Sequence, residues 1–446
     1  MSIKKFFHHE ITLVVLASLT SLFATTVHAV PSYARQTGSE CAACHVGGFG
    51  PQMTPYGMQF KLSGYTDTDG KGDNVPLSAM AVANWTRSSK DLPTAPDHFN
   101  NNNNTALQEV SAFVAGRLSD NIGTFIQGTY SGVDRKSALD QVDIRYAGNV
   151  NLGSHEGIAG VSINNNPSLT DPFNTIGQWR FPYTESDFGF GTGPSPMMES
   201  VGGSVMGLNA YTLLDKNYYA EFGVYNTMSK DTLSKINADD PGKFKNPGTY
   251  WRLAYFNDMK RDNFSIGVFG FNADLLPDRA VSGPANHYRD IGIDAGYQLL
   301  GSRENIYAVN ASYVWEKQDL KYTFGLGGSD KPKNDLNKFQ LAASYNYAQT
   351  WGFTASLFDT SSNKDFTLNT SSYNGRTSTS GYMLQADWTP WGKESSWAAP
   401  WANLRMGLQY TGYNHYEGGS HYLDDNGNDR KASGNNTVSL FLWSAI

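Results

Sequence analysis

The sequence NLRMGLQY, at residues 403–410, alternates strictly between two kinds of side chain. Leu404, Met406 and Leu408 are large and apolar, whereas Arg405 and the other intervening residues are polar or small. Successive side chains of a β-strand point to opposite faces, so this period of two predicts a strand with one apolar and one polar face. Strands in soluble sheets average about five or six residues, and the alternation here runs longer.

The same alternation recurs from Pro76 to the end of the chain and predicts about sixteen strands. The predicted strands cover residues 77–88, 106–118, 122–132, 139–148, 157–165, 203–214, 217–227, 249–258, 263–273, 287–298, 304–318, 336–348, 350–360, 379–389, 401–413 and 436–446.

The connections between the predicted strands also alternate in length. Short turns, such as residues 119–121 and 215–217, are interleaved with long polar loops, such as 319–335 and 414–435. Short turns on one rim, long loops on the other, and aromatic residues near strand ends, such as Trp388, are typical of an outer-membrane barrel. The sequence therefore predicts a mostly β protein, a transmembrane antiparallel β-barrel in the lipid of the bacterial outer membrane, rather than a soluble sandwich or a soluble barrel.

The composition excludes two other classes of protein. Only 17% of the 446 residues are charged, 13% are aromatic, and 45 are glycine. The formal net charge is −7 with no basic stretch, which argues against nucleic acid as a partner. Beyond the first thirty residues no stretch offers the roughly 18 consecutive apolar residues of a membrane helix, which excludes a polytopic helical protein.

Residues 1–29 have the three parts of a secretory signal peptide. Lys4 and Lys5 form a basic start, residues 11–26 are an apolar run, and residues 27–29 offer a small-residue cleavage site. The sequence therefore predicts export from the cytoplasm.

The only two cysteines of the chain lie in the motif Cys41-Ala42-Ala43-Cys44-His45. In an exported protein this spacing is typical of c-type haem attachment, in which Cys41 and Cys44 form thioethers with the haem vinyl groups and His45 is the proximal iron ligand. A redox dithiol would need a βαβ setting, and a zinc site would need four ligands. The motif therefore predicts one haem c.

Met53 and Met58 are the candidates for the distal haem ligand, although a methionine in a short module more often serves packing. The haem segment, residues 30–75, is too short to build its own core, so we expect the barrel, residues 76–446, to supply the missing wall. The segment is then predicted to plug or cap the periplasmic mouth. The insert 166–202, rich in aromatic residues and proline, is expected to fold inward as a constriction.

Residues 30–38, the haem motif and the sequence PQMTPYGMQFKLSGY at residues 51–65 resemble the fused monohaem cytochrome–porins of the bacterial outer membrane, which include outer-membrane iron oxidases. Cys41, Cys44 and His45 match the haem-binding positions of that family. Two positions depart from it, since Thr54 stands where the family has Asn and Met58 where it has Arg. The glycine-rich residues 46–50 also differ from the iron-oxidising members.

The resemblance implies an electron conduit that accepts single electrons from extracellular Fe(II) on the haem and passes them to a periplasmic c-type cytochrome. The activity would be that of an Fe(II):cytochrome c oxidoreductase. Asp424, Asp425 and Asp429 would attract Fe(II), or are a solvated loop tip.

Two alternatives stay open, a conduit with another donor or the opposite direction, and a haem-bearing diffusion porin or transporter. The charged residues expected in the lumen would serve a pore equally well: Glu109, Arg117, Asp143, Arg145, Asp290, Asp294, Asp387 and Arg405.

Overall fold

A computed structural model of the chain describes residues 30–71, 75–279, 283–393 and 395–446. The predicted signal peptide, residues 1–29, lies outside the described residues. In the part of the chain that is described, no helix has the length and apolar character needed to cross a membrane.

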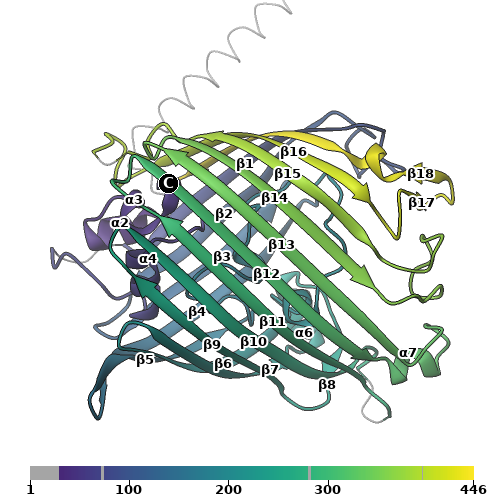
Figure 1. Cartoon of the computed structure of the whole chain (residues 1–446), viewed down its shortest axis with the longest axis horizontal. Helices are drawn as coiled ribbons and strands as arrows, with labels where there is room; N and C mark the ends of the chain where they lie inside the picture. Colours follow the sequence, from purple (N-terminus) through teal and green to yellow (C-terminus); the bar gives the residue numbers. More distant parts are fainter. Residues whose placement is uncertain (1–29, 72–74, 280–282, 394) are drawn as a thin grey trace, which may run out of the picture.

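Within the described residues, sixteen antiparallel strands form one closed barrel (Figure 1). Strands that follow each other along the chain pair with each other, and the sheet closes because β1 pairs with both β2 and β19. The barrel strands are β1 Leu77–Ser88, β2 Asn104–Arg117, β3 Ile122–Ser131, β4 Lys136–Leu152, β5 His155–Asn164, β6 Val205–Leu214, β7 Tyr218–Thr227, β9 Gly248–Asp258, β10 Asp262–Leu276, β11 Asn286–Leu299, β12 Asn305–Asp319, β13 Lys333–Tyr347, β14 Trp351–Ser362, β15 Thr379–Trp388, β16 Asn403–His415 and β19 Thr437–Ala445. Each corresponds to one predicted strand, so the predicted fold class is confirmed.

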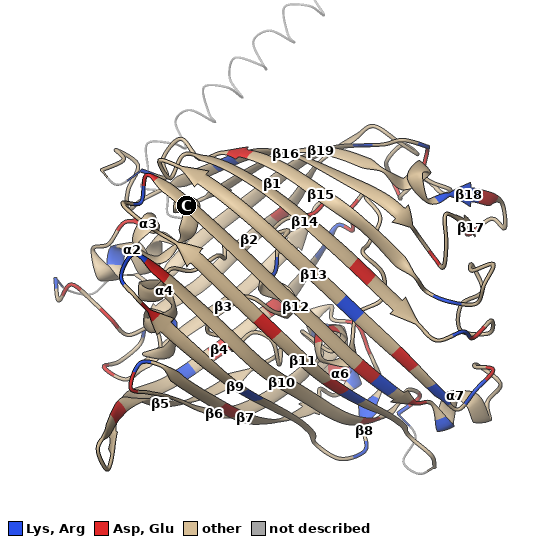
Figure 2. Cartoon of the chain, in the orientation of Figure 1, with Lys and Arg blue, Asp and Glu red and all other residues tan. Residues whose placement is uncertain are grey.

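The two faces of each strand differ as the alternation predicts. Leu384 and Leu408 are about half exposed on the outside of the barrel, at 50% and 49%, whereas Arg405 and Gln409 are buried inside it. Figure 2 shows that most of the strand length carries no charge, with single charged residues along some strands and further charges in the connections at both ends. A closed sheet with an apolar outer belt can span a bilayer, because lipid cannot form hydrogen bonds with unpaired backbone groups. The protein is therefore an outer-membrane β-barrel.

The two ends of the barrel carry different connections (Figure 1). The long loops lie at one end and contain the small elements β8 Lys243–Phe244, α6 Lys230–Ile236, α7 Lys321–Gly325, β17 His421–Leu423 and β18 Asp429–Lys431. The other end has short turns and both the start of β1 and the end of β19, which makes it the periplasmic end. One connection there departs from the pattern, since a long connection joins β15 to β16; its described residues, 389–393 and 395–402, are called the periplasmic loop below.

Residues 30–71, called the N-terminal segment below, lie in the periplasmic mouth of the barrel (Figure 1). The segment contains α2 Pro31–Thr37, α3 Cys41–Cys44 and α4 Pro55–Leu62. Its own core is small: Tyr33 stacks on Tyr65 at 5.4 Å and meets Phe60 edge-on at 4.9 Å between ring centroids. The Tyr33 hydroxyl also donates to the Thr124 carbonyl on β3 at 2.8 Å. The barrel thus completes a core that the segment is too short to build alone.

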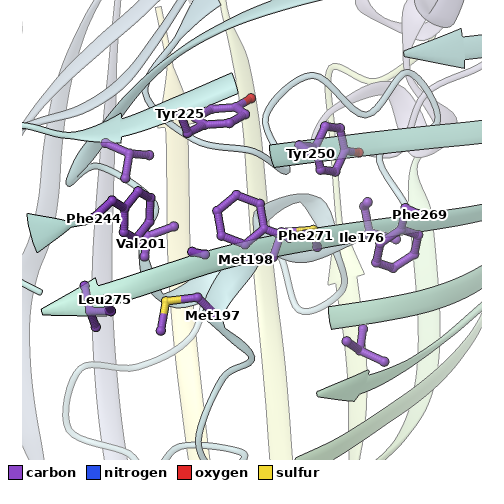
Figure 3. Close-up of a cluster of buried hydrophobic side chains, with 13 residues drawn as sticks. Ile176, Met197, Met198, Val201, Tyr225, Phe244, Tyr250, Phe269, Phe271 and Leu275 are labelled. Carbon is purple, nitrogen blue, oxygen red and sulfur yellow. The ribbon is translucent and has the colours of Figure 1, made fainter. Parts of the chain in front are cut away.

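Residues 165–204, called the insert below, connect β5 to β6 and fold into the lumen, as the sequence predicts for 166–202. The insert carries α5 Met197–Ser200. Figure 3 shows Met197, Met198 and Val201 of the insert packed against lumen-facing aromatic residues, among them Tyr225 and Phe271. A buried apolar cluster of this kind occupies space that is filled with water in an open porin.

Candidate functional site

Both cysteines of the predicted haem motif lie on a single turn of helix, and the histidine follows it directly in an extended conformation. Cys41 and Cys44 begin and end α3, and both thiols are free. The backbone N–H of His45 donates to the Cys41 carbonyl at 2.9 Å and ends the turn. Residues three apart on a helix lie on the same face, so both thiols are presented to one side.

The Nδ1 atom of His45 is buried, and in the described part of the chain it has no hydrogen-bond partner. Burial lowers the pKa of His45 to about 4, while the nearby Gln52 carbonyl acts in the opposite direction. The imidazole is therefore neutral at physiological pH, which is the form that ligates a metal. Burial also raises the pKa of the Cys44 thiol to about 12, so the thiol keeps its proton. Two free thiols and one neutral imidazole at this spacing fit covalent haem attachment.

The two candidate distal ligands lie in different surroundings. Met53 pairs with His45 through an isolated antiparallel β-bridge, so its backbone runs beside that of the histidine. Met58, on α4, is only 5% exposed and packs in an apolar cluster with Tyr211 and Tyr219 of the barrel. Met58 therefore serves packing, which is the more common role of a methionine in a short module. The identity of the distal haem ligand stays a prediction.

Side chains of the barrel hold the backbone that follows the motif. Gln349 accepts from Gly47 N at 2.9 Å, Asn403 donates to Gly48 O at 2.8 Å, Arg405 donates to Phe49 O at 2.9 Å, and Gln298 donates to Met53 O at 2.8 Å. The glycine-rich stretch makes this approach possible. Gly48 has φ +71°, and a Cβ atom there would lie 2.5 Å from the backbone of Gly392 in the periplasmic loop. The glycines of residues 46–50, which distinguish this sequence from the iron-oxidising cytochrome–porins, thus allow the N-terminal segment to contact the periplasmic loop.

Helix α4 begins after Thr54, one of the two positions that depart from the cytochrome–porin pattern. The Thr54 hydroxyl accepts from Gly57 N at 3.3 Å, which caps the helix, and donates to the Ala43 carbonyl at 2.5 Å. Threonine at an N-cap position satisfies an otherwise unpaired helix N–H. Thr54 therefore joins α4 to α3.

Lys61, near the end of α4, joins the N-terminal segment to the insert. Its ammonium donates to the Asp171 carbonyl at 2.7 Å and to Asn174 Oδ1 at 3.0 Å, and it lies 5.0 Å from the centroid of the Trp179 ring. Asn174 in turn donates to the Pro51 carbonyl at 2.7 Å. The segment and the insert thus form one packed body inside the barrel.

Most of the charges predicted in the lumen are paired and bind this body. Arg145 contacts Asp143 at 2.8 Å, Arg252 contacts Asp294 at 2.8 Å, and Arg405 contacts Asp387 at 2.9 Å. Arg145 also donates to the Lys61 carbonyl, Arg252 contacts Asp171 of the insert, and Asp290 accepts from Met198 N at 2.7 Å. Glu109 accepts from Ser111 at 2.6 Å, and Arg117 lies at the periplasmic rim beside Asp120. Arg145 and Arg252 are fully buried, so this part of the lumen is filled rather than lined by water.

The outer acidic residues do not come together as a metal site. Asp429 pairs with His421 at 2.9 Å, and Asp424 accepts backbone N–H groups of its own turn. In the described residues, no group of three or more His, Cys, Asp and Glu side chains is placed to hold a metal ion. The arrangement favours a solvated loop tip.

Sequence reasoning missed Lys61, Arg252 and the periplasmic loop. Lys61 carried one signal, since it is a lone charge between the apolar residues Phe60 and Leu62. The periplasmic loop carried another, because it is a long connection on the short-turn rim.

No protein-family model matches the chain, and no curated protein matches it. Among solved structures, the chain is similar to a Salmonella typhi OmpF in complex with daunomycin, at 12% identity and a TM-score of 0.46, covering 83% of this chain and 97% of that one. It is also similar to the outer membrane channel DcaP of Acinetobacter baumannii, at 12% identity and a TM-score of 0.45, covering 85% and 99%. At these identities the likeness concerns the barrel fold alone.

The stability of the packed body is expected to depend on pH through Lys61. Burial lowers the pKa of Lys61 to about 7, whereas an unfolded lysine keeps its proton to about 10.4. The unfolded chain therefore binds more protons above pH 7, and the free energy of unfolding should rise with pH by up to about 1.4 kcal/mol per unit. Chemical unfolding in detergent at pH 7, 8 and 9 measures this slope.

The Lys61→Met variant should lose this part of the slope. Lys71→Met is the matched control, because the Lys71 side chain is 83% exposed on the same segment, and it should keep the slope of the parent. Equal slopes in the two variants would show that Lys61 keeps an ordinary pKa.

Proposed function

We propose that this outer-membrane barrel carries one c-type haem, attached to Cys41 and Cys44 with His45 as proximal iron ligand, and passes single electrons between the cell exterior and the periplasm. One observation carries the proposal: an attachment motif lies inside a lumen that the chain itself fills. A filled lumen suits the passage of electrons better than the diffusion of solutes. The resemblance to monohaem cytochrome–porins points the same way.

When bound, the haem supplies an iron couple that takes up or releases one electron. The residues around the motif would bind and orient the haem and shield it from water. His45 offers a neutral ring nitrogen, and its position is fixed by the turn of α3. Arg303, from the turn before β12, donates to the Ala42 carbonyl at 3.4 Å and places a positive charge beside α3. Val46 packs with Ile306 of β12 and excludes water from that side.

The donor that the resemblance suggests is extracellular Fe(II), and the acceptor is a periplasmic c-type cytochrome, which would make the protein an Fe(II):cytochrome c oxidoreductase. Helix α3 lies at the periplasmic end of the barrel (Figure 1), where such a carrier would meet it directly. The insert stands between α3 and the exterior. The chemistry requires no acid–base pair or nucleophile, because the iron changes charge and the protein sets its surroundings.

A second candidate follows from the porin-like architecture, a haem-bearing barrel that passes small solutes. Its charged lumen residues would then select the solute. The salt pairs of Arg145, Arg252 and Arg405 favour the first candidate, because they bind the N-terminal segment and the insert in place.

Replacing both cysteines by alanine should abolish covalent haem without destroying the barrel. Haem stain on a denaturing gel would disappear, whereas the heat-dependent shift in mobility of the folded barrel would remain, since the strands do not need the thiols. The matched control is Cys41→Ala alone, which should retain haem through one thioether. Haem stain that survives in the double variant would contradict the assignment.

Fe(II) added to the oxidised, detergent-solubilised protein should produce the α-band of a reduced c-type haem. Dithionite measures the full amplitude in the same sample. A protein that dithionite reduces but Fe(II) leaves unchanged would overturn iron as the donor, and would leave the conduit with another donor or the opposite direction of flow.

A further inference from the structure

Two acidic residues face each other on neighbouring strands beneath the insert. Asp290 of β11 and Glu316 of β12, called the carboxyl pair below, are directly opposite in the strand register and only 1% and 2% exposed. Side chains directly opposite on two antiparallel strands are in contact, with Cβ atoms about 4.5–5.5 Å apart. A hydrogen bond joins the two carboxyl groups. Because an ionised carboxylate only accepts hydrogen bonds, this bond requires a proton on one of the two groups.

No positive charge is paired with the carboxyl pair. In the described part of the chain, no Lys, Arg or His side chain forms an ion pair with either group, and Arg180 and Lys338 bind Glu199 instead, at 2.7 and 2.9 Å. Two ionised carboxylates repel each other strongly in a buried site. The carboxyl pair therefore holds one proton.

Helix α5 of the insert is seated on the carboxyl pair. Met197 N donates to Glu316 Oε2, and Met198 N donates to Asp290 Oδ2 at 2.7 Å. Gln318 donates to Glu316 Oε1 at 2.5 Å. The oxygen of the pair that receives no hydrogen bond from a described residue is Asp290 Oδ1, which is buried. This oxygen therefore carries the proton and donates it to Glu316, and the seat of α5 depends on it.

The groups around the carboxyl pair do not change charge near neutral pH. Glu199 on α5 is held by its two cations, and Tyr288, two residues before Asp290 on β11, is a phenol that stays neutral in this range. The residues opposite the pair on its outer sides are Phe271 of β10 and Leu336 of β13, which do not titrate. Within the described residues, the seat of α5 therefore changes charge at the carboxyl pair.

We propose that this proton is a lock: it holds α5 on the carboxyl pair, and its loss opens the outer half of the lumen to small solutes from the cell exterior. When the proton leaves for the solvent, two buried charges face each other and repel, and α5 leaves its seat. The lock lies on the outer side because the insert joins β5 to β6 at the end with the long loops (Figure 1). The proposed function is not needed for this inference, since no residue of the haem motif takes part.

The lock is closed at low pH and opens as pH rises. The folded seat binds a proton that an unfolded aspartate releases above about pH 3.9, so the seat loses stability with rising pH. This sign is opposite to that of Lys61, which loses a proton in the folded state. The inner contacts of the insert, such as that of Lys61 with Asp171, do not involve the carboxyl pair and keep the periplasmic half of the lumen filled.

The methionines of α5 report whether the lock is closed. Met197 is 7% exposed and Met198 is fully buried in the apolar cluster of Figure 3. Hydrogen peroxide, added to the full-length protein in detergent at pH 6, 7, 8 and 9, transfers one oxygen to each thioether that it reaches and leaves water. Mass spectrometry of the peptide measures the rate. The rate should rise about tenfold per pH unit while most of the protein is locked, because one proton leaves for each α5 released.

Two controls accompany this measurement. Met259, in the turn before β10, is 42% exposed and should be oxidised at the same rate at every pH. The Asp290→Asn variant replaces the proton by an amide, which donates to Glu316 and still accepts from Met198 N, so oxidation of α5 should stay slow at every pH. The matched variant Asp274→Asn, on the neighbouring strand β10, changes a side chain that is 36% exposed and paired with His287, and it should keep the pH dependence of the parent.

Oxidation of α5 at the same rate at every pH in the parent would overturn the lock, and so would a rise with pH that persists in Asp290→Asn. The heat-dependent mobility of the barrel identifies the folded variants. If Asp290→Asn does not fold, the pH profile of the parent decides by itself. Because haem is not part of the readout, failure of the lock leaves the proposed function as it stands.

Discussion

The width of the barrel is the constraint on which the rest of the structure depends. Lipid forces every strand to pair with two neighbours, and sixteen strands closed in this way enclose a lumen too wide for their own side chains to fill. The chain fills it with two of its own parts, the N-terminal segment and the insert. The buried arginines Arg145, Arg252 and Arg405 serve this filling, since each pairs with a carboxylate of the barrel and also contacts the packed body.

The filled lumen connects the fold to the proposed function. Cys41, Cys44 and His45 lie on a turn that the barrel fixes from several strands, so a haem bound there would have a defined position near the periplasmic end. The same packing would stop solutes from following the electron. Lys61 is central to this arrangement, because its ammonium joins the helix after the attachment motif to the insert. Because the packed body occupies the lumen, little space remains there for the diffusion of solutes.

The sequence predicts the strands well because each carries its own signal. Period-two alternation located all sixteen, with boundaries that differ by a few residues, as where β4 extends over Lys136–Leu152 rather than 139–148. The predicted haem motif is equally local, being five consecutive residues, and its haem stays a prediction. The partners of the site were not predictable in this way: Gln298, Gln349 and Asn403 look like ordinary lumen-facing polar residues. Their role appears only when β11, β16 and the turn after β13 come together around residues 47–53.

Transport across a sealed membrane tests the central claim, that the barrel passes electrons but not solutes. Liposomes that contain the haem-loaded protein would enclose an oxidised soluble c-type cytochrome together with a small fluorescent solute, and Fe(II) would be added outside. If the barrel passes electrons but not solutes, the enclosed cytochrome becomes reduced while the solute stays inside. Escape of the solute at the rate seen with an open porin, or an enclosed cytochrome that stays oxidised with every haem-loaded barrel intact, would contradict it.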